Sequence, residues 1–370
     1  TQYNESIPWA TIDMDFMNLN QAAHGDREYG FINARLKKQN KVVVGYWERA
    51  EVQKQIAEWM DVAVAYNESF NIKVARFGDN MRNVGVTEGD KVEAQIQFGW
   101  TVDYFGIGDL VQYVNAVKEE EIDALFAEYA KLYEFDYGTY SKEAWESSVR
   151  VQASYEIAIK RFLDDGGYTA FTTNFEDLYG MKQLPGLAVQ RLMAQGYGFA
   201  GEGDWKTAAL DRLLKVMSHN QSTGFMEDYT YELAAGQESI LQSHMLEVDP
   251  TLASNKPKII VSPLGIGDRE DPARLVFDGK AGDGVVVSMA DFGTHYKLLI
   301  NEVTAFEPTV PAPKLPVARV LWNVKPNFQD GVKAWIENGG GHHTVVSLNL
   351  TTDQIVAYAK LVNLEYVIIK

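Results

Sequence analysis

Apolar residues recur at helical spacing in several segments between about residue 48 and residue 220, and short strand-like runs separate these segments. Residues 48–70 show this spacing and predict a helix, and the run IKVARF that follows predicts a strand. Ser141 and Asp204 are predicted helix N-caps, and the pair Gly166 and Gly167 is predicted to end the helix that Ser141 begins. Further helices are predicted over 91–98, 110–117, 119–133, 141–165, 185–194 and 204–217, and further strands at TAFTTNF and YGFAG. Such alternation is typical of a parallel sheet with covered faces.

Beyond Gly224 the pattern changes to β-type runs separated by Gly, Asp and Pro, which predict a second, mostly antiparallel domain. These runs are FMEDYTYEL, KIIVSPL, ARLVF, VVVSMADF, YKLLINEV and VARVLW. The tail returns to helix and strand, with helices over 328–338 and 353–362 and strands at HTVVSL and EYVIIK. Four of the eleven prolines lie between Pro308 and Pro316, so this stretch is predicted to cross the surface in extended form.

The length and composition of the chain limit the number of its domains, its binding partners and the chemistry that its side chains can perform. A chain of 370 residues is too long for one hydrophobic core, so two or three domains are expected. The formal charge of -17 disfavours nucleic acid and membrane partners, because such a surface repels phosphate and anionic lipid. The absence of cysteine excludes disulfides, thiolate metal sites and cysteine nucleophiles. With no signal peptide or membrane-spanning run in the sequence, we predict a cytoplasmic protein.

Four side chains in Gly- or Met-flanked segments of the second half are candidate metal ligands. They are Glu202 in GYGFAGEGDW, Glu227 in GFMEDY, His244 in SHMLE and His343 in GGGHHT. Two carboxylates and two imidazoles around one divalent cation leave coordination positions open, as a catalytic metal site requires. This pattern favours an enzyme.

Each candidate also has an ordinary structural interpretation. Glu202 stands between two glycines, which permit a sharp turn and close approach of a ligand, but it could instead cap the following helix. Glu227 lies in an apolar segment where a carboxylate needs a partner, although alternation alone equally allows an outward-facing strand residue. A lone histidine such as His244 is usually a satisfied surface or core residue. The glycines before His342 and His343 favour a binding loop, and spacing alone allows either histidine to be the ligand.

Nucleotide-binding motifs are absent from the sequence. The run GYGFAGEG lacks the G-x-G-x-x-G order, and no G-x-x-x-x-G-K-[ST] occurs. The run SPLGIGDRED, with Arg269 and the nearby Arg274, is interpreted as a charged turn rather than a phosphate-binding loop.

The segments GYGFAGEGDWKTAAL, FEDLYGMKQLPGLAVQRLMAQG, MEDYTYEL, SHMLEV and AWIENGGGHHTVVS closely resemble bacterial L-arabinose isomerase, and similarity extends over the whole chain. The resemblance implies conversion of L-arabinose to L-ribulose, and of D-galactose to D-tagatose, with Mn²⁺ or a similar ion such as Co²⁺. It implies metal ligation by Glu202, Glu227, His244 and His343, with Glu202 and Glu227 as the catalytic acid/base pair. It also implies six residues that line the sugar pocket: Gln21, His24, Met81, Phe175, Ile266 and His342.

The resemblance further implies a fucose isomerase-like α/β fold assembled into a homo-oligomer, a hexamer in the family. We assign residues 1–71 to the remainder of an N-terminal α/β domain, 72–222 to a central α/β domain and 223–370 to a β-rich C-terminal domain. The resemblance also implies that family members carry an N-terminal stretch ahead of the position that matches Thr1 and continue past the position that matches EYVIIK. Two alternatives to the isomerase therefore stay open: an inactive sugar- or metal-binding fragment, and metal-assisted hydrolysis by the same Glu and His residues.

Overall fold

The computed structural model describes residues 2–370, and Thr1 lies outside the described residues. The chain forms two compact units, Thr1–Ala63 and Val64–Lys370. Among residues 2–370, no helix combines the length and the apolar character needed to cross a membrane.

The first unit is helical, and none of its described residues, 2–63, lies in a strand. Asp13 caps α1 (Met14–Leu19) by accepting a hydrogen bond from the amide of Phe16, and α2 (Ala22–Arg35) follows directly. Neither α1 nor α2 contains a buried residue. The helix α3 (Ala50–Ser69), which the sequence predicts over 48–70, continues from the first unit into the second.

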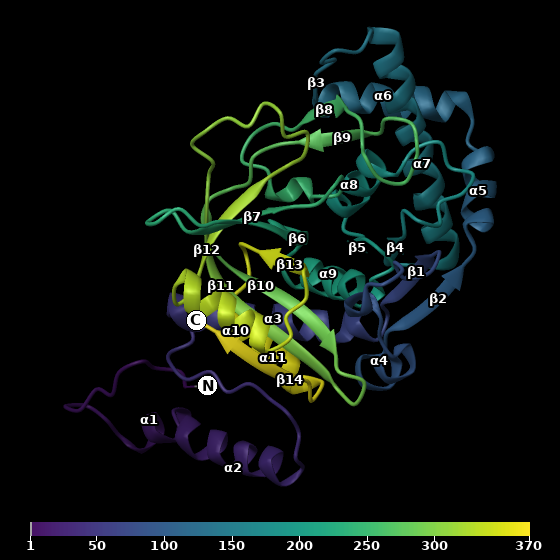
Figure 1. Ribbon diagram of the computed structural model, residues 1–370. Helices are drawn as coiled ribbons and strands as arrows, with labels where there is room; N and C mark the ends of the chain where they lie inside the picture. Colours follow the sequence, from purple (N-terminus) through teal and green to yellow (C-terminus); the bar gives the residue numbers. More distant parts are fainter. Residues whose placement is uncertain (1) are drawn as a thin grey trace. The chain divides into compact units, whose positions relative to one another are not determined.

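The second unit begins with a parallel sheet in the strand order β2-β1-β4-β5 (Figure 1). Its strands are β1 (Lys73–Phe77), β2 (Thr101–Phe105), β4 (Ala170–Thr173) and β5 (Gly198–Ala200), and every pairing is parallel. Strands β4 and β5 are completely buried, as their apolar sequences require. The predicted parallel α/β architecture is confirmed.

Helices connect these strands. They are α4 (Lys91–Phe98), α5 (Ile107–Asn115), α6 (Glu119–Leu132), α7 (Lys142–Gly166), α8 (Gly186–Ala194) and α9 (Trp205–Met217), with a short 3₁₀ turn η1 (Gly85–Thr87). All of these α-helices except α5 begin and end within one residue of the predicted bounds, and α5 begins and ends earlier than the predicted 110–117. The Ser141 hydroxyl caps α7, and Gly167 ends it in the left-handed conformation with φ of 66°. Asp204 caps α9 by accepting from the amide of Thr207. These predicted caps are confirmed.

The C-terminal part is β-rich, as predicted. Its main sheet runs β10-β13-β6-β7-β12-β11-β14, and an additional β10–β11 pairing closes the strands from β10 to β11 into a ring. The strands are β6 (Thr223–Glu232), β7 (Ser239–Ser243), β10 (Gly282–Asp291), β11 (Tyr296–Phe306), β12 (Val320–Val324), β13 (His343–Ser347) and β14 (Glu365–Ile369). Only β14 joins its neighbour, β11, in parallel.

Two helices and a small sheet complete this part. The helices are α10 (Phe328–Glu337) and α11 (Thr352–Leu361), and a 3₁₀ turn η2 (Pro250–Leu252) follows β7. The small sheet joins β3 (Glu134–Phe135), β8 (Lys258–Val261) and β9 (Ala273–Val276). Residues 307–317, which include the proline-rich stretch, form no helix or strand and are mostly exposed, so the predicted surface position is confirmed. The stretch is not extended throughout, because the Leu315 amide donates a hydrogen bond to the Ala312 carbonyl and closes a turn.

Some details differ from the sequence prediction. The helices α1 and α2 and the strands β2, β3 and β7 were not predicted. The strand β2 lies at an edge of its sheet and has only one fully buried residue, Val102, so its pattern is weak. The strand β7 carries a buried Gln242, which interrupts its apolar pattern. Arg274 is not part of a charged turn, because it lies on β9 with 1% of its surface exposed.

Candidate functional site

Glu202 follows the carboxyl end of β5, the position at which parallel α/β sheets bind ligands. Its backbone is left-handed, with φ of 62°, a conformation that is uncommon outside glycine and clusters at functional sites. The next residue, Gly203, also has a positive φ, and a Cβ there would lie 2.7 Å from backbone atoms of Asp79 and Asn80. The Glu202 carbonyl accepts a hydrogen bond from the Met81 amide at 2.9 Å. The loop after β1 therefore holds the turn that presents Glu202.

The other three candidate ligands come from neighbouring strands of the β-rich part. Glu227 on β6 and His343 on β13 are direct register partners, and Ser243 on β7 lies opposite Glu227 on its other side. His244 immediately follows that serine. The antiparallel pairing thus places Glu227, on β6, and His244, directly after the next strand, beside His343, which lies far along the sequence.

The four side chains meet at one place. One ligand atom each from Glu202, His244 and His343 lies within 4.8 Å of the others. The His343 Nε2 atom is 3.7 Å from a Glu202 carboxylate oxygen. Glu227 lies outside this closest group, but its carboxylate oxygen is 3.9 Å from His244 Nε2. The sequence prediction that these residues lie close together agrees with this arrangement.

A buried carboxylate contacts the Nδ1 atom of each of the two candidate histidine ligands, His244 and His343. The Nδ1 atom of His244 lies 2.5 Å from a Glu247 oxygen, and the Nδ1 atom of His343 lies 3.0 Å from an Asp204 oxygen. Phe225 packs edge-on against both imidazole rings, with centroid distances of 5.0 and 5.1 Å. Since each Nδ1 is engaged by an acceptor, each Nε2 is left to face Glu202 and Glu227, as in carboxylate–histidine–metal arrangements.

The sequence did not indicate either supporting carboxylate. Asp204 was recognised only as a helix cap, and Glu247 was not singled out. Asp204 performs both roles, because one of its oxygens accepts from the Thr207 amide and the other from His343. A carboxylate three residues after His244 was the available signal for Glu247.

The charges of the site are strongly coupled. Burial raises the pKa of Glu202, but a hydrogen bond from His342 and the positive charges of the three histidines more than offset this and lower it. Burial alone would lower the pKa of His244, yet the negative charge of Glu247, with smaller effects of Glu227 and Glu202, raises it to about 9. The hydrogen bond with Glu202 raises the pKa of His342. Without a bound cation, the site thus takes up positive charge as protons.

A cavity of about 190 Å³ opens beside these residues. Glu202, Glu227 and His244 line it together with three predicted pocket residues, Met81, Phe175 and Ile266. The rest of its lining is mostly apolar: Thr173, Leu178, Leu184, Pro185, Gly201, Tyr229, Met245, Leu246 and Glu247. An apolar wall with a few converging polar groups is the usual form of a small-molecule site.

The remaining predicted pocket residues lie outside this lining. His342 is 3.6 Å from the Glu202 carboxylate through its Nε2 atom. Gln21 is the N-cap residue of α2 in the first unit, and His24 lies in the first turn of that helix. Their contact with sugar stays a prediction.

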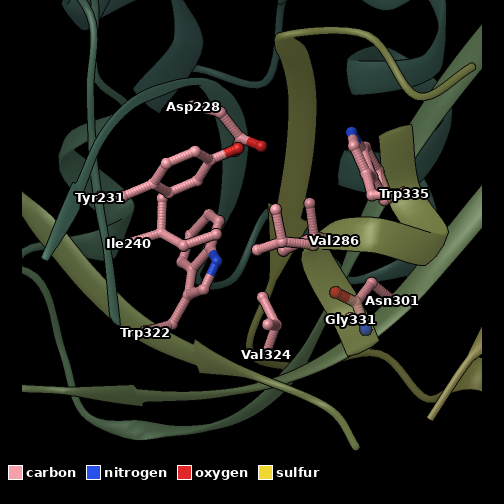
Figure 2. A pocket seen from close by; sticks show the side chains of 10 residues that line it. Asp228, Tyr231, Ile240, Val286, Asn301, Trp322, Val324, Gly331 and Trp335 are labelled. Atoms are coloured by element: carbon pink, nitrogen blue, oxygen red, sulfur yellow. The ribbon is translucent and has the colours of Figure 1, made fainter. Parts of the chain in front are cut away.

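A second cavity lies among the ring of strands of the β-rich part and is about 20 Å³ in volume (Figure 2). The indole rings of Trp322 and Trp335, the side chain of Val286 and the Asp228 carboxyl surround it. This volume admits about one water molecule. It is too small for a sugar, so we place the candidate site at the larger cavity.

The residues present fit a divalent metal ion. The Nε2 atom of His343 is buried and has no hydrogen-bond partner, although a buried polar nitrogen normally has one. Two imidazole nitrogens and two carboxylates form a mixed nitrogen and oxygen donor set, which suits a metal that keeps positions open for substrate oxygens. The fold and the site together define the class of an α/β protein with a β-rich domain and a metal-capable, sugar-sized cavity.

Comparison with known proteins gives the family. The sequence models of the N-terminal, central and C-terminal domains of L-arabinose isomerase match residues 1–71, 73–220 and 222–365. The chain is 92% identical over 370 residues to L-arabinose isomerase 2 of Bacillus licheniformis and 88% identical to L-arabinose isomerase of Oceanobacillus iheyensis. It is 58% identical over 369 residues to L-arabinose isomerase of Geobacillus stearothermophilus. These alignments cover all of this chain and 78%, 78% and 74% of the respective relatives. The chain belongs to the L-arabinose isomerase family.

Proposed function

We propose that this protein is an aldose–ketose isomerase that converts L-arabinose to L-ribulose and, more slowly, D-galactose to D-tagatose. The observation that carries the proposal is the convergence of Glu202, Glu227, His244 and His343 beside a sugar-sized cavity. The high identity to relatives named L-arabinose isomerase supports the choice of substrate.

We assign metal binding to these four side chains, with Mn²⁺ as the expected ion and Co²⁺ as its substitute. When bound, such an ion stabilises negative charge that develops on sugar oxygens during isomerisation. Glu247 and Asp204 hold the two imidazoles in the orientation that presents Nε2.

Glu202 and Glu227 are the proposed acid/base pair. Isomerisation moves a proton from C2 of the aldose to C1 through an enediol, while a second proton moves between the two oxygens. One carboxylate takes and returns the carbon-bound proton, and the other serves the oxygens. The Nε2 atom of His342 lies 3.6 Å from the Glu202 carboxylate, and the neighbouring histidines lower the pKa of Glu202 despite its burial, so this group is ionised and ready to accept a proton. The apolar lining, including Met81, Phe175 and Ile266, limits access of water to the reacting carbons.

Other parts of the assignment also stay proposals. Gln21 and His24 are proposed sugar contacts. The proposed domains are residues 1–71, 72–222 and 223–370. The protein is proposed to work in the cytoplasm as a homo-oligomer, which the family resemblance suggests is a hexamer. No partner beyond the sugar, the metal and further copies of the chain is proposed.

The activity test is direct. The purified chain is incubated with L-arabinose and Mn²⁺, and ketose is measured with time, with EDTA present in a parallel sample. We expect ketose in the first sample, at most a trace with EDTA, and a rate lower by about 10²- to 10⁴-fold in Glu202→Ala. Glu337→Ala is the matched control, because Glu337 is an exposed residue on α10. A folded parent protein that makes no ketose would favour the inactive-fragment alternative.

A further inference from the structure

Lys206 is an unusual residue, because its ammonium group is buried close to the candidate metal site. The residue has no exposed surface, although lysine is almost never fully buried unless it is paired. Its Nζ atom lies 3.3 Å from an Asp204 oxygen and 3.1 Å from the Val86 carbonyl. It does not line the sugar-sized cavity.

The contacts form a continuous path from Lys206 to the site. Lys206 pairs with one oxygen of Asp204, and the other Asp204 oxygen lies 3.0 Å from His343 Nδ1. On the far side of that imidazole, Nε2 is buried, has no hydrogen-bond partner and faces Glu202. Each link is buried, with relative exposures of 0% for Lys206 and 1% for His343.

The contact between Lys206 and Asp204 balances the charge of a buried carboxylate. Asp204 is fully enclosed, and an uncompensated carboxylate in such a place is strongly unfavourable. The Lys206 ammonium, 3.3 Å from an Asp204 oxygen, is a buried cation that compensates this charge. The helix-cap bonds from Thr207 are also made to Asp204, but they come from neutral donors.

We propose that Lys206 is a positioning residue for the metal site: it holds the Asp204 carboxylate as a fixed, charge-balanced acceptor, and Asp204 in turn holds His343 with Nε2 toward the cation. This inference rests on the proposed metal-dependent function. It adds a residue that is buried away from the substrate and acts through two others.

A purely structural role is the competing explanation. The bond from Lys206 to the Val86 carbonyl ties down the segment that precedes α4, and Gly89 packs closely on the lysine chain, where a Cβ would lie 2.6 Å from Lys206 Cδ. In that case the lysine would matter for this segment alone, and its effect would not depend on Asp204.

A double-mutant cycle separates the two explanations. Dissociation constants for Mn²⁺ are measured by calorimetry on the full chain for the parent, Lys206→Met, Asp204→Asn and the double variant, with thermal unfolding as the folding check. We expect Lys206→Met to weaken Mn²⁺ binding by about 10- to 100-fold in the parent background. In the Asp204→Asn background the same change should alter the constant by less than about threefold, because there is no longer a carboxylate to balance. An equal loss in both backgrounds, or no loss in the parent, would overturn the proposal.

Failure to fold is also informative in this design. If Lys206→Met is unfolded and the double variant folds, the unbalanced carboxylate is the cause and the proposal stands. If both are unfolded, Lys206 acts independently of Asp204 and the proposal falls.

A second measurement does not require the metal. NMR of ¹⁵N-labelled histidine in the metal-free protein reports which nitrogen of His343 carries the proton. We expect the Nδ1–H form in the parent and its loss in Lys206→Met. A parent with this form that binds no Mn²⁺ would refute the metal-dependent function, whereas an unchanged His343 signal in Lys206→Met would refute the role of Lys206.

Discussion

His244 is the residue of the site whose charge responds most clearly to its surroundings. The nearby Glu247 carboxylate raises its pKa to about 9, so below that pH the metal-free imidazole holds a proton. A metal ion must displace this proton, because only the neutral ring offers a lone pair. We therefore expect Mn²⁺ affinity to rise with pH between about 6.5 and 8.5, by up to about tenfold per pH unit. Calorimetric titrations at several pH values measure this dependence.

The substitution Glu247→Gln tests the contact between Glu247 and His244 by removing the charge of the carboxylate. The amide can still accept a hydrogen bond from Nδ1, but it carries no charge, so the pKa of His244 should fall and the pH dependence of Mn²⁺ affinity should flatten. At the upper end of the pH range the variant should bind about 10- to 100-fold more weakly, since the ligand is held less firmly. Glu337→Gln on the exposed face of α10 is the control. Identical pH profiles for the parent and Glu247→Gln would show that this pairing does not govern His244.

The types and spacing of the residues indicated which side chains take part in the chemistry, but not how these side chains are arranged in space. The glycines around Glu202 and before His343 predicted exposed backbone turns, and Glu202 does adopt a left-handed φ. Lys206 and Asp204 could not be recognised as supporting residues, because their role depends on a contact between Asp204 and His343 across 139 positions of sequence. Helix capping is local and was therefore predictable, whereas the second use of the same carboxylate was not.

The helix α9 connects the site to a second buried charged group. Seven positions after Asp204, Asp211 is fully buried and accepts a hydrogen bond from the Phe199 amide of β5 through one oxygen, while its other oxygen has no partner. Lys215, on the next turn, pairs with Asp249. Burial, reinforced by the charge of Asp249, raises the pKa of Asp211 to about 7.

This raised pKa predicts how stability depends on pH. The folded state binds the Asp211 proton more tightly than the unfolded state, whose pKa is near 3.8, so folding takes up a proton between these values. The contribution is complete below pH 3.8 and is lost as pH rises through about 7. Asp211→Asn keeps an acceptor for Phe199 and stays neutral, so its Tm should fall less than that of the parent between pH 5 and 8. Thermal unfolding at matched pH values decides this, and parallel pH curves for the two proteins would contradict it.

Elements with strong periodicity were predictable, and those shaped by tertiary contacts were not. The helices over 91–98 and 204–217 follow from cap and period, and the structure places α4 and α9 within one residue of these bounds. The strand β2 escaped prediction because an edge strand needs few buried side chains. Closure of the β-rich part into a ring depends on pairing between β10 and β11 on one side and β10 and β13 on the other, which no single segment encodes.

For the whole molecule, the first unit presents a large apolar surface. The helices α1 and α2 contain no buried residue, and the exposed fractions of Trp9, Leu19 and Phe31 are 78%, 67% and 64%. Soluble monomers rarely expose apolar surface on this scale, and short helices without packing partners are only marginally stable in water. In the homo-oligomer that we propose, further copies of the chain would cover this surface.

Assembly can be measured directly by size-exclusion chromatography with light scattering. We expect the parent to elute with a mass that is a multiple of 41.5 kDa, and the variant Trp9→Glu/Phe31→Glu to shift toward the single-chain mass, because the charges oppose burial of this surface. Val310→Glu is the matched control, since Val310 is 70% exposed in the proline-rich stretch. If Gln21 and His24 contact sugar in the assembled protein, the double variant should also show a higher KM for L-arabinose, with Mn²⁺ affinity unchanged at the four ligands of the second unit. A parent that elutes as a single chain and is nevertheless fully active would refute both the assembly and its link to the sugar site.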